Sequence, residues 1–273
     1  MNWRTIVGFS FVMTFLVAVI AWDGYLRQEF DSGVRRSLSQ PIRLEVENSD
    51  AYREFLLGLR VHHYRAQSQG RAKYTDVYYD TVASDLFNHG YSYRFRTHVQ
   101  ADNQRTYSIR LEQEPRFVHA DSKKIDIVSR LPVTLGDAIM NGEWDQAVTG
   151  GRGLTAPDRL RRLLTKLEIE PQSLQPRLVG ELDRERFDIT DKGQNWFELD
   201  HERWTFRPIG EWSSLTSVQY EDLVFDTKLR KENPELVRRV RTMYQFANMI
   251  DGVKFSERVP HERATEALGV NPP

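Results

Sequence analysis

The chain has 273 residues, of which 40% are hydrophobic and 11% aromatic, so it can bury a substantial core in one large domain or two small ones. Its 38 basic and 39 acidic side chains give a formal charge of −1, which excludes a global field that attracts nucleic acid; any anion site must be a local concentration of cations. The absence of cysteine excludes disulfides, thiolate nucleophiles and cysteine-ligated metal sites.

The first 24 residues predict a membrane anchor. Ile6 to Trp22 is a run of 17 residues without a charge, and Trp3 and Trp22 supply an interfacial aromatic at each end. The alternative is a cleaved signal peptide, because Ala21 places a small residue before a cleavage point. We therefore expect a single-pass protein of the bacterial inner membrane, with a juxtamembrane linker over 25–41. Basic residues on both sides of the run leave the orientation open.

The rest of the sequence predicts a mostly β domain over 42–260, followed by a C-terminal tail over 261–273. Alternating segments bounded by turn residues predict strands at 42–48, 74–81, 91–99, 105–114, 123–131, 178–190, 194–206 and 215–226. Helical patterns interrupt them at 50–60, 135–148, 156–168 and 234–250. In the last of these, apolar residues recur at steps of three and four, which predicts a helix that packs on the sheet.

Six of the predicted strands have one charged face. In 91–99, for example, Arg94 and Arg96 alternate with Tyr93 and Phe95. An antiparallel sheet with one face in water gives the same alternation for solubility alone. Here the charges are mainly Arg and Glu, basic and acidic rows fall on different strands, and the apolar rows suit a covering of helices. We therefore predict an α+β fold in which an antiparallel β tunnel or barrel has a charged interior and flanking helices.

A row of arginines in a confined channel has a specific chemical use. Guanidinium groups offer paired donors to phosphoryl oxygens and keep their charge when buried, so the row suits a linear polyphosphate. Carboxylates such as Glu45 and Glu47 in the same channel would repel that ligand unless a divalent cation lay between them, which predicts Mg²⁺ or Mn²⁺. Phosphoryl transfer needs little beyond such positioning and neutralised charge.

Nucleic-acid binding is a weaker interpretation of the same strands. The aromatic residues of "YSYRFR" lie on the face opposite to the arginines, which suits core packing better than base stacking. We therefore expect no nucleic-acid partner. Histidine spacing gives no zinc motif, and "TGGRGLT" lacks the spacing of a phosphate-binding P-loop.

Six segments carry a family resemblance, in the order "TDVYYDTVASDLFNHGYSYRFRTH", "YSIRLEQEP", "LQPRLVGELDRERFDIT", "NWFELDHERWTF", "VQYEDLVFDTKLRKENPELVRRV" and "GVKFSERV". Together they resemble the polyphosphate polymerase domain of the vacuolar transporter chaperone (VTC) and the related CYTH phosphohydrolases, which share the triphosphate tunnel fold. The similarity runs from about Arg43 to Arg258, nearly all of the part after the predicted anchor.

The resemblance implies roles for individual residues in a tunnel that binds triphosphate or a growing polyphosphate with a divalent metal. The implied phosphate-binding residues are Arg94, Arg96, Arg110, Lys124, Arg184 and Arg186. The implied metal ligands are Glu45, Glu47, Asp200 and Glu221, with Asp222 as a competing register for the last.

The chain also departs from the family pattern. Asn48 and Glu114 stand where lysines are usual, and "KID" at 124–126 replaces a pair rich in basic residues. Losing cations should weaken both the binding of a polyanion and the neutralisation of a transition state. Three functions therefore stay open: a polymerase that uses nucleoside triphosphate, a hydrolase of inorganic or organic triphosphate, and a non-catalytic domain that binds polyanions or a partner protein.

Overall fold

The computed structural model describes residues 41–100, 102–113, 125–209, 217–227, 234–256 and 258–270. The predicted anchor over 1–24, all but the last residue of the linker, and Lys124 lie outside these ranges. In the part of the chain that is described, no helix has the length and apolar character needed to cross a bilayer.

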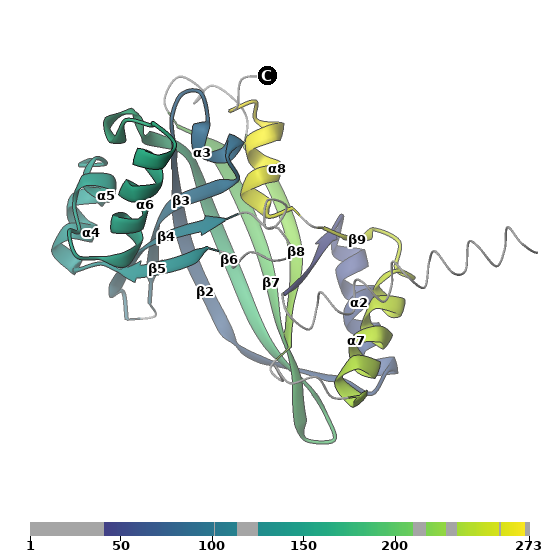
Figure 1. Ribbon diagram of the computed structural model, residues 1–273. Coiled ribbons are helices and arrows are strands. Elements are labelled where there is room, and N and C mark those ends of the chain that lie inside the picture. Colours follow the sequence, from purple (N-terminus) through teal and green to yellow (C-terminus); the bar gives the residue numbers. More distant parts are fainter. Residues whose placement is uncertain are drawn as a thin grey trace, which may run out of the picture.

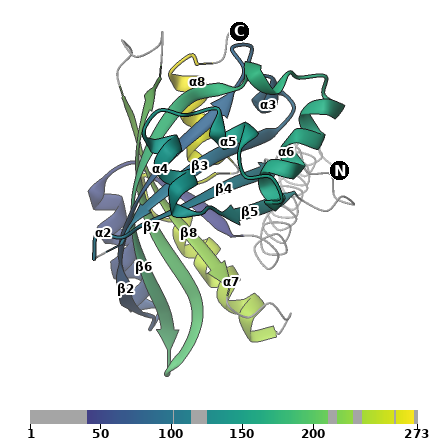
Figure 2. The ribbon, with the colours of Figure 1, turned by 90° about the vertical axis from the view of Figure 1, so that its left-hand side faces the viewer.

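A single antiparallel sheet of nine strands organises the described residues, in the order β5-β4-β3-β2-β6-β7-β8-β1-β9. Its curvature is visible in Figures 1 and 2, where β3, β4 and β5 run across the long strands β2, β6 and β7. The strands are β1 (Ile42–Val46), β2 (Arg65–Asp80), β3 (Tyr91–Val99), β4 (Arg105–Gln113), β5 (Asp126–Arg130), β6 (Gln175–Asp191), β7 (Gln194–Pro208), β8 (Val218–Thr227) and β9 (Val253–Phe255).

The strand register gathers the charged residues on one face of this sheet. Residues directly opposite each other in neighbouring strands point to the same side. Asp76 lies opposite Arg96, and Arg186 lies opposite Asp200. We call this side the arginine face; its charged members include Arg43, Glu45, Asp76, Arg94, Arg96, Arg110, Arg184, Arg186, Asp200, Glu202 and Asp222.

Helices cover part of the opposite side, called here the outer face (Figure 1), and the sheet is apolar under them. At one end α2 (Ser49–Val61) and α7 (Pro234–Ala247) pack on β1, β7 and β8 through a cluster that includes Leu44, Phe225 and Val240. At the other end a cluster around Phe95 and Leu160 is covered by α4 (Val133–Met140), α5 (Gln146–Thr149) and α6 (Thr155–Lys166). The predicted antiparallel sheet with flanking helices is confirmed.

The C-terminal segment differs from the prediction. Residues expected to form a tail from 261 onward include α8 (Pro260–Ala267), which packs on the arginine face. Ala264 and Leu268 join an apolar cluster with Trp204 and Phe206 of β7. This helix has little sequence signal, because the few apolar residues in "PHERATEALGV" give a weak helical pattern. The apolar end of the arginine face that they cover could not be located from sequence.

Two other elements differ from the predicted ones by more than a few residues. β2 begins at Arg65 rather than 74, because its polar first half pairs with β6 as far as Thr190 although it shows no alternation. The segment predicted as one helix over 135–148 forms α4 and α5, separated at Gly142, whose φ of +104° only glycine adopts readily. The short elements α3 (Asp85–Asn88) and the 3-10 turn Pro171–Ser173 were not predicted.

Candidate functional site

Two of the predicted phosphate-binding arginines converge on Asp76. Arg96 donates from Nε and Nη2 to the two carboxylate oxygens, at 2.6 Å each, and Nη1 of Arg94 lies 3.0 Å from Oδ2. The Asp76 side chain is 0% exposed. Burial alone would raise the pKa of this carboxyl, but the charges of Arg96 and Arg94 hold the pKa below its ordinary value. Asp76 is therefore an ionised group enclosed by cations.

The second predicted pair of arginines is held in the same way. Arg186 donates to Asp200 at 2.7 and 3.0 Å, and Nη2 of Arg184 donates to Oε1 of Glu202 at 2.8 Å. Glu202 is almost fully buried and also accepts hydrogen bonds from Arg43 and from the indole of Trp204. Although burial opposes ionisation, the charges of Arg43 and Arg184 lower the pKa of Glu202 to about 2.

The arginines around Asp76 and those around Glu202 and Asp200 are neighbours, and Tyr74 lies between them. The guanidinium carbon of Arg96 is 4.7 Å from the centre of the Tyr74 ring, and that of Arg184 is 5.3 Å from the same point. Arg110 extends the face on β4, where it pairs with Asp126 and Glu112 and remains 28% exposed. The structure thus brings together five of the six predicted phosphate-binding residues, and the sixth, Lys124, lies outside the described residues.

Asp222 extends this network of ion pairs to α8. It is fully buried, it lies 2.6 Å from Nη1 of Arg43, and it accepts from Arg263 at 2.7 Å. Burial raises the pKa of Asp222 above its ordinary value in spite of these two cations. Arg263 also lies 3.1 Å from Glu45. Sequence reasoning missed Arg263 because it lies in the presumed tail, and it missed Asp76 because no local pattern marks that carboxylate.

The structure does not bring the four predicted metal ligands together. Glu45 pairs with Arg263, Glu47 with Lys254, and Asp200 with Arg186. Glu221 points to the outer face, where one of its oxygens is 2.6 Å from Nε2 of His201; its neighbour Asp222, the competing register, lies on the arginine face. Successive residues of a strand point to opposite faces, so a shift of one residue decides whether Glu221 or Asp222 lies on the arginine face.

The arrangement of these carboxylates does not suit Mg²⁺ or Mn²⁺. Such ions prefer several carboxylate or carbonyl oxygens around one point. Within the described ranges, no three or more His, Asp or Glu side chains are grouped in that way. The carboxylates of the arginine face instead accept hydrogen bonds from guanidinium groups. The described donor set therefore does not fit a divalent metal centre, and we derive no chemical step through one.

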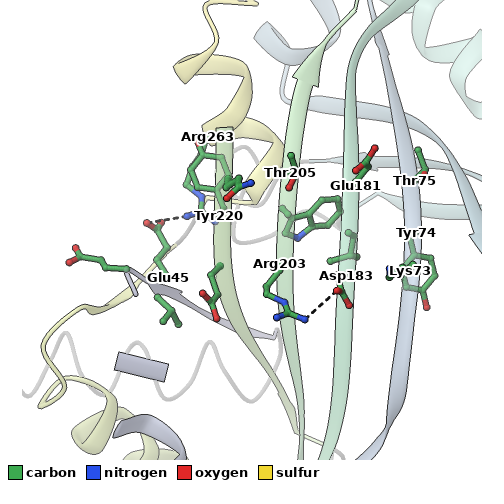
Figure 3. A pocket seen from close by; sticks show the side chains of 16 residues that line it. Glu45, Lys73, Tyr74, Thr75, Glu181, Asp183, Arg203, Thr205, Tyr220 and Arg263 are labelled. Atoms are coloured by element: carbon green, nitrogen blue, oxygen red, sulfur yellow. Dashed lines mark hydrogen bonds and ion pairs between the residues drawn. The ribbon is translucent and has the colours of Figure 1, made fainter. Parts of the chain in front are cut away.

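An open groove of about 820 Å³ crosses the outer face (Figure 3). Alternation places Lys73, Asp183 and Arg203 on this side, and Arg203 points toward Asp183. The groove also reaches Glu45 and Arg263 beside β8, and these two side chains point toward each other. Its lining carries five carboxylates and three cations, so it suits a polyanion less well than the arginine face does.

Comparisons with known proteins support the fold. No family model matches the sequence, and no curated protein does. A Hippeastrum protein studied as a candidate adenylyl cyclase, and reported to have a dominant triphosphatase activity, superimposes with a TM-score of 0.52 at 12% identity. The match covers 83% of this chain and 95% of that one. At this identity the likeness shows a shared fold alone.

Two further solved structures are less similar. A candidate adenylate cyclase from Bacillus halodurans gives a TM-score of 0.48 at 11% identity, covering 82% of this chain and 96% of that one. A protein from Pyrococcus horikoshii gives 0.43 at 14% identity, covering 83% and 99%.

Proposed function

We propose that the arginine face binds a linear triphosphate or polyphosphate. The observation that carries this proposal is that Arg96 of β3 and Arg184 of β6 both lie over the ring of Tyr74. Arg94 and Arg186 lie two residues away along the same strands, on the same face. Guanidinium groups fixed on rigid strands suit phosphoryl oxygens because they present paired donors and cannot lose their charge. The fold shared with the Hippeastrum protein supports the same class of ligand.

The ion pairs leave donors for such a ligand. A guanidinium has five N–H donors, and Asp200 takes two of those of Arg186. The Arg186 side chain is still 44% exposed, and that of Arg110 is 28% exposed, so both retain N–H groups that a phosphate can reach. The carboxylates hold the guanidinium planes in fixed orientations, which lowers the entropic cost of binding.

Hydrolysis of a triphosphate is the second candidate function, favoured by the reported activity of the protein that shares the fold. Chain elongation from a nucleoside triphosphate, as in the VTC domain, is a finer form of the same proposal. The pairing of every described arginine of the site with a carboxylate favours a third form, in which the domain binds the polyanion without turnover. We also propose that residues 1–24 tether the domain to a membrane.

The experiment that tests the proposal uses the full-length chain in detergent. Triphosphate, polyphosphate and ATP are titrated calorimetrically, first with a chelator and then with Mn²⁺, while released phosphate and chain length are measured in parallel. We expect binding of triphosphate or polyphosphate in chelator. Phosphate release indicates the hydrolase, growth of chains indicates the polymerase, and binding without either indicates the non-catalytic form.

A matched pair of variants locates the site. Arg96→Ala removes a guanidinium from the arginine face, whereas Arg203→Ala removes one from the outer groove. We expect Arg96→Ala to weaken binding about tenfold or more, the usual scale for a charged hydrogen-bonding group, and Arg203→Ala to leave it unchanged. Absence of binding by the unmodified chain, or equal effects of the two variants, contradicts the proposal.

A further inference from the structure

Asp76 occupies the position on the arginine face where an anion is best held. Its two oxygens receive a bidentate pair of hydrogen bonds from Arg96, the same arrangement by which a guanidinium binds a phosphate. Arg94 contacts it from the same strand, and Arg184 adds to its electrostatic stabilisation from the other side. Asp76 lies on β2, the strand between β3 and β6, and therefore between the two arginine pairs.

One carboxylate serves two arginines at this point. Arg94 and Arg96 together carry two positive charges, and both form an ion pair with Asp76. The carboxylate is attached to the same sheet, so it remains at high effective concentration and a free anion must compete with it. A small anion gains contact with one arginine pair, while a linear polyphosphate can contact the pairs of β3 and β6 at the same time.

We propose that Asp76 is a built-in competitor that makes the arginine face selective for anions with several linked phosphoryl groups. Orthophosphate does not displace the carboxylate, whereas a triphosphate compensates by reaching Arg184 and Arg186. This inference rests on the proposed function and specifies its ligand: the site takes condensed phosphates and rejects single phosphate groups.

The test compares the unmodified full-length chain with Asp76→Asn, which keeps the size of the side chain but removes its charge. Calorimetric titrations use sodium triphosphate and orthophosphate, in chelator and at fixed salt. Removing one negative charge a few ångströms from the ligand should tighten triphosphate binding by at least about tenfold. The variant should also acquire measurable orthophosphate binding, so that the ratio of the two affinities falls.

Two further variants keep the test decisive. Asp183→Asn removes a carboxylate that pairs with Arg71 and Arg203 on the outer face, and should leave both affinities unchanged. Asp200→Asn frees Arg186 at a position that is more exposed than Asp76, so this variant should fold even if Asp76→Asn does not. It should also tighten triphosphate binding, as Asp76→Asn does. A metal-ligand role for Asp200 predicts no such gain in chelator.

The possible results separate the two proposals. If neither the unmodified chain nor the variants bind triphosphate, the proposed function itself is wrong. If the unmodified chain binds triphosphate but Asp76→Asn and Asp200→Asn bind it equally or more weakly, the competitor role is wrong while the proposed function stands. Thermal unfolding provides a second measurement: triphosphate should raise the unfolding temperature of Asp76→Asn more than that of the unmodified chain.

Discussion

Replacing Glu202 by glutamine should lower the free energy of unfolding by about 3 kcal/mol at pH 7. Glu202 is only 3% exposed, and it accepts hydrogen bonds from Arg43, Arg184 and Trp204 at 3.0, 2.8 and 3.1 Å. These partners lower its pKa from 4.5 to about 2. Each unit of pKa corresponds to about 1.4 kcal/mol of preference for the ionised form, which gives the figure of about 3 kcal/mol.

The sign of this effect fixes its pH dependence. Because the folded pKa is depressed, the stabilisation is fully present above the ordinary pKa of 4.5 and is lost as the pH falls toward about 2. The unmodified chain should therefore lose its advantage over Glu202→Gln between about pH 5 and pH 2. The lowered pKa of Asp76 makes both proteins sensitive to acid, but it cancels in the difference between them.

Urea denaturation at a series of pH values from 7 to 3 measures this difference. The matched control is Glu181→Gln, because Glu181 also pairs with an arginine, Arg207, but both side chains are 54% exposed. Exposed pairs of this kind contribute at most about 1 kcal/mol. Equal stability of Glu202→Gln and the unmodified chain at neutral pH, or a difference in stability that stays constant down to pH 3, would contradict this prediction.

Three other predictions follow from the packing and the charges. Gly58→Ala places a Cβ 1.8 Å from the Phe246 ring, so it should destabilise the contact of α2 with α7 by about 1–3 kcal/mol in urea denaturation, whereas Leu57→Ala at an exposed position should change little. Arg263→Ala leaves the buried Asp222 with Arg43 alone, and hydrogen exchange should show α8 losing protection before the sheet does. Because the described residues do not form a metal site, Mg²⁺ or Mn²⁺ without phosphate should not raise the unfolding temperature; a rise of several degrees would reveal a site.

Much of the sheet could be predicted from sequence because its strands keep one face apolar. The alternation of Tyr93 and Phe95 with Arg94 and Arg96 located β3 at its observed bounds. The first half of β2 lacked this signal, since "RAQSQGRA" has no large apolar residue and is held as a strand by its pairing with β6. Burial against covering helices produces a local pattern, whereas pairing between distant strands does not.

The candidate site could be predicted only as a face. The arginines of that face follow from alternation within single strands, but their partners depend on the register between strands. Asp76 meets Arg96 because β2 and β3 pair as they do, and nothing within "TDVYYD" indicates it. The choice between Glu221 and Asp222 depended on a shift of one residue, which a sequence pattern of this length does not fix.

The two cations that share Asp222 come from opposite ends of the described domain: Arg43 belongs to its first strand and Arg263 to its last helix. A protein emerges from the ribosome from its N-terminus, so more than 200 residues separate the synthesis of one partner from that of the other. Until Arg263 has been synthesised and has left the ribosome, Asp222 can have Arg43 but not Arg263 beside it. Completion of this buried network is therefore a late step that follows translation of α8.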